Sequence, residues 1–130
     1  MEAKSMQKKR PKHLNLIKIR LPLPGVISIL HRVSGALLFF PGIPALLYGL
    51  QLTLGSPQSH EELKTLLLSP LVKIALMLPL WFFLHHFCAG IRYLALDLHI
   101  GIALAQARKS SVLVLVAGAV LTLLIGIAIW

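Results

Sequence analysis

The chain has 130 residues, of which 57% are apolar and only 13% are charged, and its mean hydropathy is +0.83. This composition excludes an ordinary water-soluble domain and indicates an all-α integral membrane protein. The formal net charge is +9, but the basic residues carry no aromatic or glycine-rich RNA-binding pattern, so we expect no nucleic-acid partner. Three spans of roughly 20 residues use most of the chain, so any catalytic globular domain must belong to another subunit.

Residues 1–24 are predicted to form a short basic arm. Seven of the 13 Lys and Arg residues precede the first long apolar run, and beside a membrane span they act as an orientation signal or as a dock for a partner. They are Lys4, Lys8, Lys9, Arg10, Lys12, Lys18 and Arg20. The apolar run that follows is too long and begins too late for a cleaved secretory signal.

Residues 25–130 are predicted to form a three-helix transmembrane domain. The first helix is expected at about residues 26–54, where Pro41 and Pro44 predict a kink or an irregular turn. The polar run 58–64 is expected to form the first loop.

The second helix is expected at about residues 66–96, with Lys73 extending its ammonium group to the interface. A second loop is expected at residues 106–110. The third helix, residues 111–130, contains no charge and no histidine and is interpreted as scaffold.

The distribution of Lys and Arg near the helix ends predicts the orientation. The N-terminal arm is strongly basic and the second loop carries Arg108 and Lys109, whereas the first loop offers only Lys64. We therefore expect a multi-pass protein with a cytoplasmic N-terminus, or a matrix-side one in a mitochondrion.

Ionisable residues occur inside two otherwise apolar segments, residues 28–35 and 85–97. Because charged groups within a span cost several kcal/mol unless they are paired or hydrated, they favour a functional role over simple extension to the interface. With antiparallel helices, both segments lie at the cytoplasmic end and form one cluster, in which a histidine below guanidinium groups suits a haem and its propionates. These residues are His31, Arg32, His85, His86, Arg92 and Asp97.

Spacing leaves two points open. His85 and His86 lie about 100° apart on a helix, so only one of them can face a given site. Gly35 follows His31 and Gly90 follows His86 by four residues, and these glycines either leave a gap for a flat macrocycle or serve helix–helix packing.

These motifs resemble those of the cytochrome b membrane-anchor subunits of succinate dehydrogenase (respiratory complex II), most closely the proteobacterial form. The resemblance covers essentially the whole chain. It is carried by Arg10-Pro11, the run Ser28-Ile29-Leu30-His31-Arg32-Val33-Ser34-Gly35, the run His86-x-x-x-Gly90-Ile91-Arg92, Asp97 and the terminal Trp130.

The resemblance implies a non-catalytic-core subunit of an oxidoreductase, with no catalytic residue of its own. Such a subunit anchors the flavoprotein and iron–sulfur subunits to the bacterial inner membrane and shares one b-type haem with a second small anchor, so its helices form half of a haem-containing bundle. His86 would be the axial ligand, and His31, Arg32 and Arg92 would contact the haem propionates. Ser28 and Arg32 would form part of the site of ubiquinone reduction, linking the tricarboxylic acid cycle to aerobic electron transport.

The sequence departs from the family at Tyr93, where bacterial relatives often have histidine, so Arg92 is the safer propionate contact. For Ser28, the alternative is a helix cap or a backbone hydrogen bond. Two alternative functions fit the sequence less well. A dihaem quinol:fumarate reductase anchor needs four deep histidines, and a cofactor-free structural anchor leaves the clustered ionisable residues unexplained.

Overall fold

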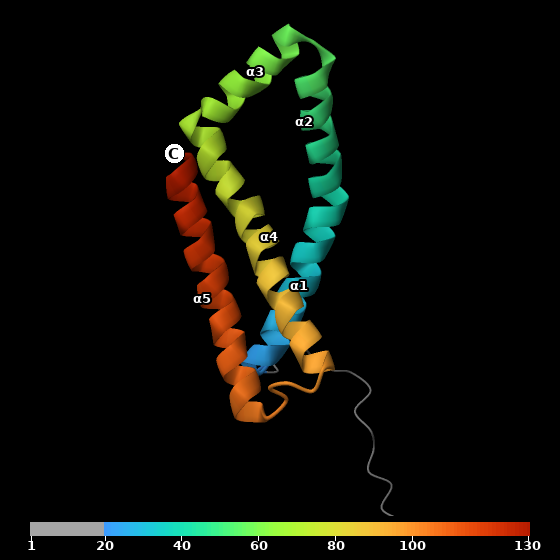
Figure 1. Ribbon diagram of the computed structural model, residues 1–130, viewed down its shortest axis with the longest axis vertical. Helices are drawn as coiled ribbons and strands as arrows, with labels where there is room; N and C mark the ends of the chain where they lie inside the picture. The colour runs from blue at the N-terminus through green and yellow to red at the C-terminus, as the bar shows by residue number, and fades with distance from the viewer. Residues whose placement is uncertain (1–19) are drawn as a thin grey trace, which may run out of the picture.

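The computed structural model describes residues 20–130, and every regular element in this range is a helix (Figure 1). Three stretches, Leu23–Gly55, Pro70–Asp97 and Leu104–Ile129, are long and apolar enough to cross a membrane. The all-α membrane fold with three spans is therefore confirmed. The elements in order are α1 (Leu23–Leu37), η1 (Leu38–Gly42), α2 (Ile43–Gly55), α3 (Pro57–Leu68), α4 (Pro70–Asp97) and α5 (Leu104–Ile129). The Arg10-Pro11 motif and all but the last residues of the basic arm lie outside the described range.

The first span contains the irregular turn that its prolines predict. Pro41 lies inside η1, a single π-helical turn, and the amide of Ile43 donates to the carbonyl oxygen of Leu38 five residues earlier. Proline cannot donate a helical hydrogen bond, and a wider turn accommodates its ring without ending the helix. The span continues as α2, and Pro44 lies in its first turn.

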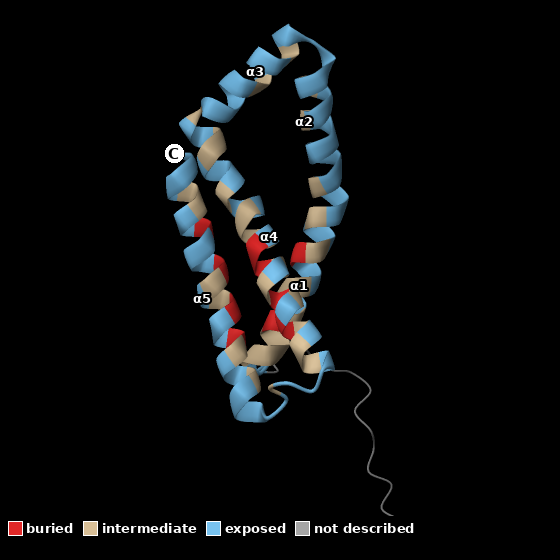
Figure 2. Ribbon diagram, in the orientation of Figure 1, coloured by how far each residue is buried: buried red, intermediate tan, exposed pale blue. Residues whose placement is uncertain are grey.

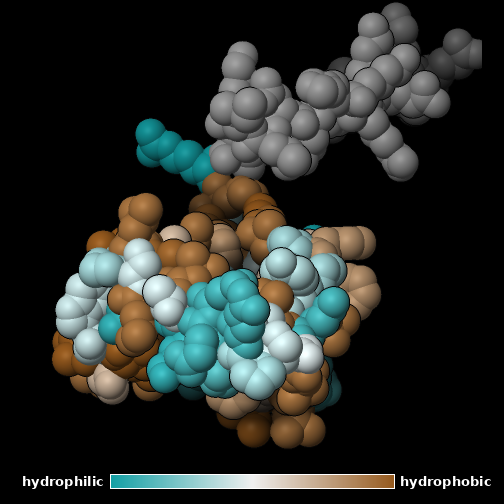
Figure 3. Space-filling view, turned by 90° about the horizontal axis from the view of Figure 1, so that it is seen from above, coloured by the Kyte–Doolittle hydropathy of each residue, from teal (hydrophilic) through white to brown (hydrophobic). Residues whose placement is uncertain are grey.

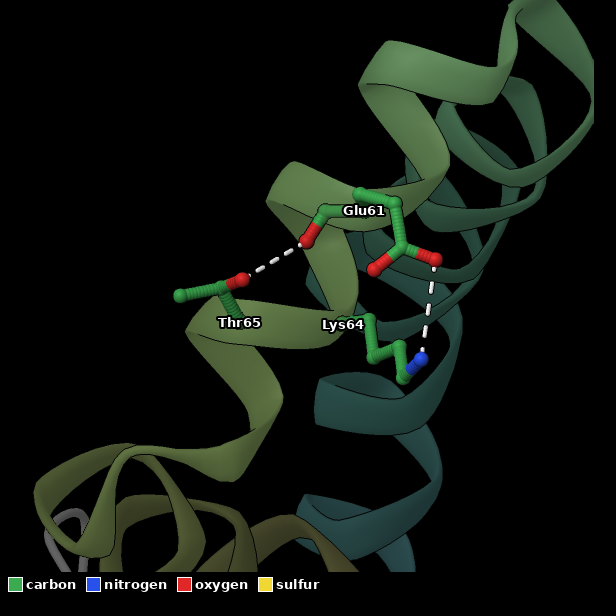
Figure 4. Close-up of polar contacts among 3 residues, drawn as sticks. All are labelled: Glu61, Lys64 and Thr65. Carbon is green, nitrogen blue, oxygen red and sulfur yellow. Dashed lines mark hydrogen bonds and ion pairs between the residues drawn. The ribbon is translucent and has the colours of Figure 1, made fainter.

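The prediction of a first loop at residues 58–64 is wrong, because residues 57–68 form the helix α3. Ser56 caps it, accepting a hydrogen bond from the amide of Ser59 at 3.1 Å, and Pro57 begins it. Polar side chains do not prevent a helix at the membrane surface. On α3, Glu61 pairs with Lys64 at 3.5 Å and its carbonyl oxygen accepts from the Thr65 hydroxyl at 2.8 Å (Figure 4).

Seen from the α3 end of the molecule, hydrophilic side chains gather over α3 with apolar side chains around them (Figure 3). The second span accordingly begins at Pro70 rather than at residue 66.

The second connection also differs from expectation. It comprises residues 98–103, where His99 and Gly101 have positive φ angles of 61° and 77°, and the third span begins at Leu104 rather than at residue 111. Residues 106–110 are helical because Gln, Arg, Lys and Ser are compatible with a helix whose end reaches water. The change of chain direction depends on the left-handed backbone just before them.

The buried residues gather where α1, α4 and α5 meet, at the end of the molecule opposite α3 (Figure 2). Ile27, Ala89 and Val114 form the apolar centre of this contact. Small residues on α5 let α4 approach closely, as is usual between helices in lipid. In contrast, α2 contacts only η1 and α3 among the described elements and stands apart from α4 (Figure 1).

Candidate functional site

His31 on α1 and His86 on α4 meet across the interface between these helices. Their rings stack with centroids 4.1 Å apart and planes 13° apart, and the ring of Tyr93 lies 5.2 Å from that of His31. The sequence-based prediction that residues 28–35 and 85–97 form one cluster is therefore confirmed for these side chains.

The two glycines beside the histidines make this contact possible. A Cβ at Gly35 would lie 2.8 Å from Cε1 of His86, which is closer than real Cβ contacts, and one at Gly90 would lie 3.8 Å from Nε2 of His31. Each helix thus accommodates an imidazole of the other helix beside a glycine. Of the two roles that the sequence left open, the structure displays helix packing, with imidazoles occupying the space beside both glycines.

The hydrogen bonds of His86 define its tautomer. Its Nδ1 lies 3.0 Å from the carbonyl oxygen of His31 and 3.2 Å from the hydroxyl oxygen of Ser34. A carbonyl oxygen can only accept, so Nδ1 carries the proton and donates. The Ser34 hydroxyl donates to the same carbonyl oxygen at 3.0 Å. In the neutral ring, the lone pair is consequently on Nε2, which has no hydrogen-bond partner within residues 20–130.

His85 has a different environment from its neighbour. It is fully buried, its backbone and Cβ lie 3.4–3.6 Å from where a Cβ at Gly118 on α5 would stand, and its ring stacks on Trp81 at 5.3 Å. Both of its ring nitrogens lack a hydrogen-bond partner in the described part of the chain. His85 and His86 therefore face different helices, as their spacing predicts.

Ser28 and Arg32 lie one turn apart on α1, near the end where the chain enters the span. The guanidinium Nη2 of Arg32 donates to the hydroxyl of Ser28 at 3.1 Å, with Arg32 exposed and Ser28 half-buried. The N-cap of α1 is Pro22, so Ser28 does not cap the helix. A hydroxyl and an exposed guanidinium on one helix face can together bind a carbonyl or carboxylate oxygen.

Arg92 makes its hydrogen bonds to α5. Its Nε donates to the Ser110 hydroxyl at 2.9 Å and its Nη2 to the carbonyl oxygen of Ala107 at 3.3 Å. The structure brings His31, His86 and Tyr93 together, and the guanidinium carbon of Arg92 lies 5.2 Å from the centre of the Tyr93 ring. Asp97, the last residue of α4, is exposed.

Sequence reasoning assigned no role to two serines that the structure uses. Ser34 bonds His86, and its spacing of three residues from His31 was a usable signal because the two then share a helix face. Ser110 bonds Arg92. The sequence predicts a loop at residues 106–110, and a loop position does not relate Ser110 to a face of α4.

Comparison with known proteins agrees with this arrangement. Residues 6–125 match the family model described as the succinate dehydrogenase/fumarate reductase transmembrane subunit. The chain belongs to this family. A protein of Coxiella burnetii (strain RSA 493 / Nine Mile phase I), named succinate dehydrogenase cytochrome b556 subunit, is 36% identical over 126 residues, which are 96% of this chain and 100% of the relative. A protein of the same name from Paracoccus denitrificans is 35% identical over 120 residues, 89% of this chain and 91% of the relative.

Proposed function

We propose that the chain is the cytochrome b membrane-anchor subunit of a succinate dehydrogenase, and that His86 is an axial ligand of one b-type haem. The observation that supports this most directly is the protonation pattern of His86. Its Nδ1 proton is donated to a backbone carbonyl, which leaves the Nε2 lone pair for a metal. Metal-ligating histidines usually donate their other ring N–H to a carbonyl or a carboxylate in this way.

The remaining groups fit a haem at this position. A haem held by two imidazoles supplies reversible one-electron chemistry. In this chain, the His31 carbonyl and the Ser34 hydroxyl fix the orientation of the His86 ring. The second imidazole would come from the second small anchor subunit, because His31 stacks on His86 instead of facing it from across a gap.

For the haem propionates we propose His31 and Arg32 as the contacts. His31 lies beside the ligand, and Arg32 is exposed one residue away on α1. The corresponding role of Arg92 stays a prediction: its hydrogen bonds run to α5, and its guanidinium carbon lies 5.2 Å from the ring of Tyr93.

We also propose that Ser28 and Arg32 form this chain's part of a ubiquinone-reduction site. The hydroxyl can donate a hydrogen bond to a quinone carbonyl oxygen, and the guanidinium stabilises negative charge on that oxygen as the quinone is reduced. Their mutual hydrogen bond of 3.1 Å holds both groups on one helix face.

The subunit would be part of a heterotetramer in the bacterial inner membrane. The flavoprotein and iron–sulfur subunits would bind at the cytoplasmic side, next to the basic N-terminus. This side corresponds to the end of the molecule that carries Ser28, Arg32, Arg108 and Lys109. The family description also covers fumarate reductases, but both relatives compared here are named as succinate dehydrogenase subunits.

Replacing His86 with Leu in the intact complex tests the proposal. We expect loss of the six-coordinate haem spectrum, or of the haem itself in a pyridine haemochrome assay. His85→Leu is the matched control, since it removes the adjacent imidazole from the face that contacts α5, and it should keep the spectrum. An unchanged six-coordinate spectrum in His86→Leu would refute the assignment.

A further inference from the structure

Arg92 is a buried cation without a counter-charge. Its relative exposure is 7%, and the only ion pair within residues 20–130 is Lys64–Glu61, at the opposite end of the molecule. The acceptors of its two hydrogen bonds, Ser110 and Ala107, are neutral, and so is the ring of Tyr93, which lies 5.2 Å from the guanidinium carbon. Because a guanidinium has five N–H donors, three remain for another acceptor. A buried charge with only neutral partners is costly, and an anion beside it would offset this cost.

Arg92 lines a cavity of about 540 Å³ between α4, α5 and the connection that joins them. This volume lies within the roughly 300–1,000 Å³ typical of small-molecule sites. Apolar side chains form most of the wall, and Arg92, Gln106 and Ser110 supply its polar groups. No residue of α1 lines the cavity, so it is separate from the His31–His86 group.

The position of the cavity indicates the depth of its ligand. Arg92 precedes the end of α4 at Asp97 by five residues, which is about 7–8 Å along the helix and corresponds to the boundary between headgroups and acyl chains. Exposed Arg108 and Lys109 lie at the same end, and Asp97 is the only acidic residue there within the described range. This basic end favours the anionic lipids of the leaflet that it contacts.

We propose that the cavity binds one anionic phospholipid. Its headgroup phosphate contacts the free N–H donors of Arg92 beside Ser110 and Gln106, and an acyl chain lies along the apolar wall near Ala117. The lipid neutralises the buried guanidinium and joins α4 to α5. This site uses neither the haem ligand nor the residues proposed for quinone.

The test uses the purified, delipidated complex, titrated with dioleoylphosphatidylglycerol or with zwitterionic dioleoylphosphatidylcholine, and native mass spectrometry to count the lipids retained. We expect the wild-type complex to retain one phosphatidylglycerol at least tenfold more tightly than Arg92→Gln, and to prefer it to phosphatidylcholine. Arg108→Gln removes an exposed cation at the same end that does not line the cavity, and it should bind as the wild type does. Ala117→Phe places a larger side chain in the apolar part of the cavity and leaves Arg92 unchanged. This variant should lose the lipid and keep its haem.

Equal retention in Arg92→Gln and the wild type, or full retention in Ala117→Phe, would overturn the proposal. So would an equal loss in Arg108→Gln, which would indicate a general effect of charge. Displacement of the lipid by millimolar inorganic phosphate alone would reassign the cavity to a free anion. If Arg92→Gln loses haem but retains the lipid, Arg92 serves the haem instead. If Arg92→Gln does not assemble, Ala117→Phe and the preference between the two lipids decide the question.

Discussion

The imidazoles of His31 and His86 stack at 4.1 Å across the α1–α4 interface. The contact is reciprocal, because His86 lies beside Gly35 of the facing helix and His31 lies beside Gly90. The His31 backbone adds the carbonyl oxygen that accepts from His86. A change at either glycine therefore acts directly on the orientation of the neighbouring imidazole.

Gly35→Ala is expected to disturb haem binding without removing any haem-binding group. The new Cβ would lie 2.8 Å from Cε1 and 3.3 Å from Nδ1 of His86, so the ring must move from its present position. An off-rotamer side chain costs on the order of 1 kcal/mol, which is about fivefold in an equilibrium constant. We expect a shifted haem spectrum and about fivefold weaker haem retention in the purified complex.

Gly49→Ala is the control for this prediction. Gly49 lies on α2, where an added Cβ would meet nothing within 4 Å, and it carries the same change in helix propensity. Equal behaviour of the two variants would show that the ring of His86 does not need the space beside Gly35.

His85→Leu is expected to keep the haem and to leave the thermal stability of the complex unchanged or raised. Both ring nitrogens of His85 are buried without a hydrogen-bond partner among residues 20–130, and an unsatisfied buried polar group costs about 1–3 kcal/mol. An apolar side chain of similar size avoids this cost while keeping contact with Trp81, on which the imidazole stacks. Differential scanning calorimetry measures the effect, and a lowered melting temperature would indicate that His85 has a partner from another subunit.

The sequence predicted the three spans and the proximity of residues 28–35 to residues 85–97 because hydropathy and antiparallel topology follow directly from residue order. It did not predict that the rings of His31 and His86 stack. It placed the ends of the helices less well, as at α3, since polar residues are equally compatible with a loop and with a surface helix. The sequence also could not predict which partners the Arg92 guanidinium would bind. Five donors can serve several partners, and the hydrogen bonds to α5 depend on how two helices pack.

The proposed topology predicts that Lys109 and Gln58 lie on opposite sides of the membrane. In a background with Cys88→Ala, a cysteine introduced at Lys109 should react with an impermeant maleimide only when the cytoplasmic side is accessible, because basic helix ends stay on that side. A cysteine introduced at Gln58, in the first turn of α3, should react from the periplasmic side of intact cells. The reverse pattern would contradict the orientation.

Ser28→Ala and Arg32→Leu are expected to impair electron transfer to quinone selectively. The two side chains are joined by a hydrogen bond of 3.1 Å on one face of α1, and neither has another side-chain partner in the described range. Loss of one preorganised donor to a developing oxyanion costs about 10²–10³ in rate at a buried catalytic site. At this partly exposed site we expect the rate of quinone reduction to fall about tenfold in Ser28→Ala. The fall should be larger in Arg32→Leu, since the charge is lost as well.

The measurement compares succinate-to-ubiquinone activity with the transfer of electrons from succinate to an artificial dye that accepts them from the soluble subunits. Only the first activity should fall, and the haem content should stay at one per complex in Ser28→Ala, because its hydroxyl is not proposed to contact the haem. Arg108→Gln serves as the matched control for loss of a cation at the same end of the molecule, since Arg108 is exposed and on α5. An equal fall in both activities would indicate an assembly defect. Full quinone reductase activity in both Ser28→Ala and Arg32→Leu would exclude this helix face from the quinone site.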